Sequence, residues 1–197
     1  MAARERALSA SRRAIRSSAN AIRAIHREEP EAAHRLMEEA RAAIEDGMAA
    51  VRDHPDVLFA GFLQDAQKEY VEARVTEVVI DGGEVPTPDE LGVQLAPYLN
   101  GMAEAIGEAR RHILDLLRKG EVARSEAMLR SMEEIYYLLV SMDYPDAITG
   151  NLRRTTDVAR SIMEKTRGDL SLSIVQRDLR DALERHAREV GTADPTP

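Results

Sequence analysis

The chain has 197 residues, of which 44% are hydrophobic but only 4% aromatic, and its formal net charge is −8. This length suits one domain with its own core, and the acidic balance argues against a generally basic nucleic-acid-binding protein. The absence of cysteine excludes disulfides and thiolate sites, and the apolar runs are too short to span a membrane, so we expect a soluble, cytoplasmic protein.

The N-terminal half of the chain predicts three helices. Apolar residues at helical spacing indicate a first helix over about 4–27. Pro30 favours the start of a second helix, over about 30–52, because proline fits the first turn and breaks a helix elsewhere. A third helix is expected over about 55–80, ended by Gly82 and Gly83.

The C-terminal half continues the helical pattern. Thr87-Pro88-Asp89-Glu90 is typical of an N-cap followed by a first helical turn, and it predicts a short helix. Three long helices are then expected over about 96–118, 121–140 and 151–186. The intervening segment 141–150 is expected to be a loop, and Gly168 is a candidate break in the last helix. No stretch alternates as a strand would, so the fold class is all-α with six or seven helices.

Basic residues gather in two segments of this acidic chain. In the first helix, four arginines follow one line at helical spacing: Arg12, Arg16, Arg23 and Arg27. In the last helix, three arginines recur every seven residues: Arg153, Arg160 and Arg167. Such segments can form a local anion-binding surface, or they can be solvated helix faces with ion pairs.

Two pairs of glutamates are the strongest chemical candidates. In the third predicted helix, Glu69 falls in line with Ala66 and Ala73, within an apolar stripe, and Glu72 projects beside it. A carboxylate that points into a helical bundle needs a partner, because burying an unpaired charge costs several kcal/mol, on the order of 3–5.

The second pair, Glu104 and Glu108, lies on the helix expected over 96–118. Gly101 and Ala105 share its face, and residues this small let another helix approach. His112 follows on the same face and is expected at the surface or hydrogen-bonded. Four carboxylates from two helices favour a hard divalent cation, Mg²⁺ or Mn²⁺. Spacing alone leaves open a surface role, in ion pairs with Arg110 or Arg111.

Other enzyme classes also use acidic residues on helices. Di-iron bundles need Glu-x-x-His from two helices, and neither glutamate pair supplies the histidine. All-α nucleotide pyrophosphatases use paired acidic motifs, which the chain matches in part, because its second pair is spaced by four residues rather than three.

Three motifs resemble a known family, in the same order along the chain. The stretch 67–73 (Gln-Lys-Glu-Tyr-Val-Glu-Ala) resembles the Q-E-Y-V-E-A signature of translin-associated factor X. Residues 98–108 resemble that family's Y-L-x-G-x-A-D-x-x-G-E. The run 152–170 resembles the last helix of translins. The chain is identified as a prokaryotic or archaeal member of the translin superfamily, with a single translin-like α-helical domain over 1–190 and a disordered tail over 191–197.

The resemblance implies a fold and a function. Translins are seven-helix bundles that assemble into hollow octamers and bind single-stranded RNA or DNA. Translin-associated factor X adds Mg²⁺-dependent endoribonuclease activity through four acidic residues, which fall here on Glu69, Glu72, Glu104 and Glu108. Where the family has an aspartate, this chain has Glu104, so the negative charge is kept on a side chain that is longer by one methylene group. These four are the expected catalytic residues and ligands of Mg²⁺ (or Mn²⁺).

The resemblance also gives the basic segments a role. The seven arginines named above are expected to follow the backbone of single-stranded RNA or DNA, and the three in the last helix have binding of a neighbouring subunit as an alternative. Two alternatives stay open: a non-catalytic single-strand-binding oligomer, and a nucleotide pyrophosphatase.

Overall fold

A computed structural model gives the fold of residues 2–191, and within that range every regular element is a helix. Six helices are long: α1 Ala2–His26, α2 Pro30–Ala50, α4 Phe62–Asp81, α6 Leu95–Arg118, α7 Val122–Val140 and α9 Leu152–Gly191. Three are single turns of four residues: α3 Pro55–Leu58, α5 Pro88–Leu91 and α8 Asp146–Thr149. The predicted all-α class is confirmed.

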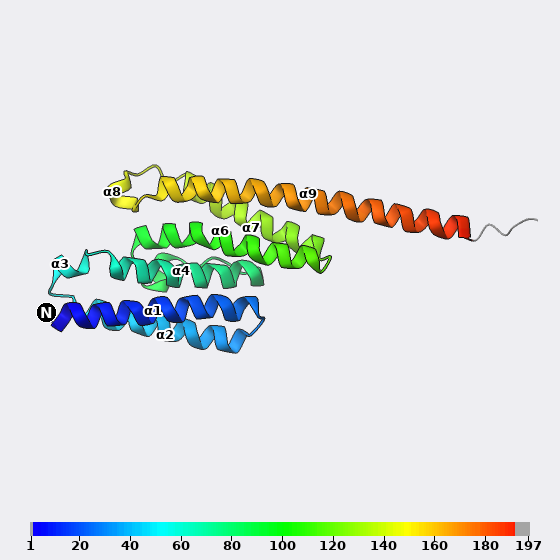
Figure 1. Ribbon diagram of the computed structural model, residues 1–197. Helices are drawn as coiled ribbons and strands as arrows, with labels where there is room; N and C mark the ends of the chain where they lie inside the picture. Colours follow the sequence, from blue (N-terminus) through cyan, green and yellow to red (C-terminus); the bar gives the residue numbers. More distant parts are fainter. Residues whose placement is uncertain (1, 192–197) are drawn as a thin grey trace, which may run out of the picture.

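The long helices lie side by side in three layers (Figure 1). The α1–α2 hairpin packs against α4, α4 packs against α6, and α6 carries α7 and α9 on its other side. The C-terminal part of α9 continues well past the end of the bundle. Among the residues described, no helix has the length and hydropathy needed to cross a membrane.

Local signals placed several helix ends correctly. Pro30 occupies the first turn of α2. Thr87 caps α5 through a capping box, in which its hydroxyl accepts from the backbone N–H of Glu90 and the Glu90 carboxylate accepts from the backbone N–H of Thr87 at 2.7 Å. Gly82 ends α4 in the left-handed conformation that favours glycine.

Three boundaries differ from the prediction. The helix expected over 55–80 is interrupted before Phe62, because Gly61 has a φ of +95° and cannot continue a right-handed helix. The segment 141–150 contains the short helix α8. Gly168 does not break α9, since one helical glycine costs only about 1 kcal/mol and neighbouring Leu170 and Thr166 are buried. Of the expected tail, Gly191 ends α9, and 192–197 lie outside the described residues.

The close approach of α4 and α6 positions the glutamates. Gly101 faces α4, and a Cβ at this position would lie 2.6 Å from the Lys68 carbonyl oxygen and 2.7 Å from the Cβ of Val71. This confirms the prediction that small residues on α6 admit another helix. The α4–α6 connection is also fixed to α4, because the fully buried Gln67 accepts from the backbone N–H of Gln94 at 2.8 Å.

Candidate metal centre

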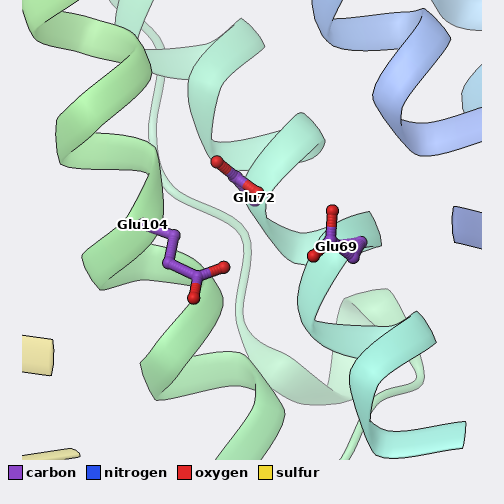
Figure 2. Close-up of side chains that lie close together, drawn as sticks. All are labelled: Glu69, Glu72 and Glu104. Atoms are coloured by element: carbon purple, nitrogen blue, oxygen red, sulfur yellow. The ribbon is translucent and has the colours of Figure 1, made fainter. Parts of the chain in front are cut away.

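Three of the four predicted glutamates converge between two helices. Glu69 and Glu72 project from α4 and Glu104 from α6, and each offers a carboxylate oxygen such that the three atoms lie within 4.8 Å of one another (Figure 2). The three-residue spacing on α4 places its two glutamates side by side, and the contact at Gly101 brings α6 close enough for Glu104 to face them.

Burial and mutual repulsion both act on the cluster. Burial raises the pKa of Glu72 to about 8, and the negative charges of Glu69, Glu104 and Glu108 add to the rise. The carboxyl of Glu72 is therefore mostly protonated at neutral pH while no additional cation is present. A group of oxygen donors that repel one another in this way fits a hard divalent cation, which would restore the charged form of all three.

A lysine already contributes positive charge to the cluster. The ammonium Nζ of Lys68 lies 2.7 Å from one carboxylate oxygen of Glu104, donates to the other at 2.8 Å, and lies 3.5 Å from Glu69. Burial alone would lower the pKa of Lys68, but the hydrogen bond to Glu104 and the acidic neighbours raise it above its ordinary value.

Glu108 does not join the converging oxygens. Its carboxylate lies 2.5 Å from Nε2 of His26 on α1, and Arg111 approaches it at 3.6 Å. The hydrogen bond to His26 lowers the pKa of Glu108, against the effect of burial. The His26 side chain is only 5% exposed, so this contact holds Glu108 at the edge of the cluster, close enough for its charge to act on Glu72.

His112 differs from its prediction. It is buried rather than at the surface, and its Nε2 has no hydrogen-bond partner among the described residues. The rings of His26 and His112 lie 6.1 Å apart between centroids. The reason is the packing of α1 on the bundle, because the C-terminal end of α1 places His26 over this part of α6.

The predicted basic residues divide into two groups. Four are engaged within the chain: Arg23 bonds Asn20, Arg27 pairs with Glu29, Arg160 donates to the Tyr136 hydroxyl, and Arg167 pairs with Glu133. The other three are exposed and make no hydrogen bond or ion pair within the part of the chain that the structure describes: Arg12, Arg16 and Arg153.

Sequence reasoning missed two residues at the centre. Lys68 could have been found, because it is next to Glu69 and four residues before Glu72, a spacing that makes helix neighbours. His26 carried no such signal, since it is separated from Glu108 by 82 positions and meets it only through tertiary packing.

Comparisons with known proteins place the chain in a family. No family model matches it. An uncharacterised protein of Methanocaldococcus jannaschii is 35% identical over 128 residues, which make up 64% of this chain and 57% of that protein; the chain thus spans little more than half of that relative. The structure of AfC3PO in complex with duplex RNA is 34% identical, with a TM-score of 0.81 over 89% of this chain and 91% of AfC3PO. The chain belongs to the translin superfamily.

Further structures agree with a translin fold. A second structure of AfC3PO gives the same identity and TM-score and is covered over 92% of its length. The structure of apo-NeC3PO is 23% identical, with a TM-score of 0.78 over 87% of this chain and 89% of NeC3PO, which shows the shared fold. The translin resemblance of the sequence motifs is thereby confirmed, and the three converging glutamates lie within those motifs.

Proposed function

We propose that this translin-superfamily protein is a Mg²⁺-dependent endoribonuclease that acts as an oligomer. The observation that carries the proposal is the convergence of carboxylate oxygens from Glu69, Glu72 and Glu104 within 4.8 Å, between two helices of the bundle. Their hard oxygen donors suit Mg²⁺ or Mn²⁺. Such an ion, when bound, supplies an activated water and offsets the charge of a phosphodiester under attack.

The four glutamates have different proposed roles at the metal site. The three converging carboxylates would hold the ion, and Glu72 would release its proton as the ion binds, because its pKa of about 8 reflects burial beside other negative charges. Glu108 would border the site as the fourth acid, kept in place by His26.

The proposed substrate is RNA. The AfC3PO structure contains duplex RNA, whereas the translin motifs of the sequence imply single-stranded RNA. The exposed guanidinium groups of Arg12 and Arg16 on α1 and of Arg153 on α9, which are unpaired within residues 2–191, are the proposed phosphate contacts, since arginine binds phosphate through paired N–H groups. The four arginines that already bond within the chain are weaker candidates.

An RNA cleavage assay tests the proposal. Labelled single-stranded and duplex RNA are incubated with the wild type in Mg²⁺ and in EDTA, and with the variants Glu69→Gln, Glu72→Gln and Glu104→Gln. Loss of one metal ligand is expected to lower the cleavage rate at least about 100-fold, more than the loss of a residue that only supports a ligand. Glu126→Gln, an exposed glutamate of α7, is the matched control and is expected to cleave as the wild type does.

Other outcomes point to other functions. Equal cleavage by the wild type and the cluster variants, or no cleavage by any, would overturn the proposal. RNA binding that persists in EDTA and in the glutamate variants, without cleavage, would favour a non-catalytic binding oligomer. Release of pyrophosphate from nucleoside triphosphates, without action on RNA, would favour a pyrophosphatase.

The proposed assembly uses the projecting part of α9. Beyond Leu170, four large apolar side chains lie along one side of this helix at spacings of three and four, each between 57% and 63% exposed: Leu172, Val175, Leu179 and Leu183. The polar positions alternate in sign, as in Arg177 and Asp178 or Arg180 and Asp181. Most of the stability of a helix in a protein comes from packing of its apolar face. A second copy of the same segment offers a matching apolar stripe.

Mass measurement tests the assembly. Leu179→Arg is expected to shift the wild-type oligomer to smaller species in size-exclusion chromatography with light scattering, because it places a charge in the apolar stripe. Asp181→Arg, on the opposite side of the same helix, introduces the same side chain and is expected to leave the mass unchanged. If both variants keep the wild-type mass, the α9 stripe is not the interface.

A further inference from the structure

The ammonium of Lys68 contacts carboxylate oxygens that belong to the proposed metal ligands. Its Nζ is 2.7–2.8 Å from the two carboxylate oxygens of Glu104 and 3.5 Å from Glu69. Two of the three glutamates of the cluster thus direct oxygens to this lysine. Within the described residues, Glu72, the third glutamate of the cluster, makes no ion pair or hydrogen bond with Lys68.

The ammonium and a divalent ion compete for the same oxygens. Mg²⁺ requires its oxygen ligands at about 2.0–2.1 Å in a near-octahedral arrangement. An ion at that distance from Glu104 would lie within a few ångströms of an ammonium still hydrogen-bonded to the same carboxylate, and two positive charges that close repel strongly in a partly buried site. The Lys68 backbone belongs to α4, which packs closely against Gly101 of α6. Rotation of the flexible side chain would release the carboxylates without moving the helix.

We infer that Lys68 is a built-in competitor of the metal, which must release Glu104 and Glu69 before a divalent ion can bind. Lys68 therefore stabilises the metal-free protein and sets the concentration of ion at which the centre fills. The inference rests on the metal site of the proposed function but not on RNA cleavage, so binding measurements alone can test it.

Metal titration of charge variants measures the competition. Mn²⁺ binding is followed by electron paramagnetic resonance in the wild type, Lys68→Gln and Lys68→Arg. Removing the ammonium is expected to tighten Mn²⁺ binding at least about tenfold, whereas arginine keeps the competing charge and is expected to bind no more tightly than the wild type. Lys119→Gln is the matched control, because it removes one lysine and one Lys–Glu ion pair, that with Glu28, away from the cluster. It is expected to leave Mn²⁺ affinity unchanged.

A second measurement uses the wild type alone, so it does not depend on a variant that folds. The chain has three lysines, Lys68, Lys119 and Lys165, and lysine labelled with ¹³C at Cε gives one signal for each. Addition of diamagnetic Mg²⁺ is expected to shift the Lys68 signal toward that of a solvated lysine, and to leave the other two signals in place.

The outcomes separate this inference from the proposed function. If Mn²⁺ binds equally to the wild type and to Lys68→Gln, or if the Lys68 signal stays in place as Mg²⁺ saturates the site, the competition is disproved and the metal site stands. If no variant binds Mn²⁺, the metal site itself fails and the inference fails with it. Tighter binding by Lys68→Gln, with wild-type affinity in Lys119→Gln, supports the competition.

Discussion

Gly101→Ala is expected to lower the free energy of unfolding by about 2 kcal/mol or more. The added methyl would meet the Lys68 carbonyl oxygen at 2.6 Å and the Val71 Cβ at 2.7 Å, so α4 and α6 would have to move apart. Overpacking of this kind costs about 3 kcal/mol, and more where backbone must move. The gain in helix propensity from glycine to alanine returns only about 1 kcal/mol. Urea unfolding followed by circular dichroism measures the difference.

The same helix supplies a matched control. A Cβ at Gly107 would meet only Cδ1 of Ile162 at 3.9 Å, an ordinary contact, so Gly107→Ala is expected to gain up to about 1 kcal/mol. Opposite changes in unfolding free energy at two glycines of α6 would show that the α4 contact, not the loss of glycine, is responsible.

Gly101→Ala is also expected to weaken Mn²⁺ binding, because Glu104 would move away from Glu69 and Glu72. Equal unfolding midpoints for Gly101→Ala and the wild type would contradict this packing.

Glu72→Gln is expected to stabilise the metal-free protein at alkaline pH. Burial and neighbouring charges raise the folded-state pKa of Glu72 from its ordinary value of 4.5 to about 8. The neutral carboxyl therefore contributes stability that is complete below pH 4.5 and is lost as the pH rises through about 8. Glutamine keeps the shape and stays neutral. With about 1.4 kcal/mol per pKa unit, the variant is expected to exceed the wild type by about 5 kcal/mol near pH 9.

Urea unfolding in EDTA across the pH range measures this difference. The gap between Glu72→Gln and the wild type is expected to be small near pH 5 and to widen up to about pH 9, whereas Glu126→Gln, on the exposed side of α7, is expected to show no such trend. Mg²⁺ is expected to restore stability to the wild type at high pH and to do little for Glu72→Gln, which lacks a metal ligand. A gap that does not change with pH would disprove the raised pKa.

The sequence predicted those parts of the centre that depend on helical geometry. Three-residue spacing brought Glu69 and Glu72 to one side of α4, and the small Gly101 marked the face of α6 that meets another helix. The partners that come from another helix could not be predicted, because these contacts depend on how helices distant in sequence pack together. Glu108, for example, pairs with His26 of α1, which lies 82 positions away in the sequence.

For the arginines of the basic segments, the sequence likewise predicted the spacing but not the contacts. Helical spacing placed Arg160 and Arg167 on one line of α9, but it could not show that this line faces α7, where Tyr136 and Glu133 bind them. The interruption at Gly61 was likewise not predictable, since a helical pattern tolerates an isolated glycine, and only the positive φ of Gly61 in the structure shows that the helix is interrupted there.

The contact between His26 and Glu108 joins the beginning of the chain to its centre, across 82 positions. The restraint on Glu108 therefore requires α1 to be docked on the bundle, and α1 also packs against α4, the helix that carries Glu69 and Glu72. A change along α1 that hinders its docking, such as a bulky fusion, would release Glu108 and at the same time remove the support of α4. The acidic centre thus depends on a helix that contributes no carboxylate to it.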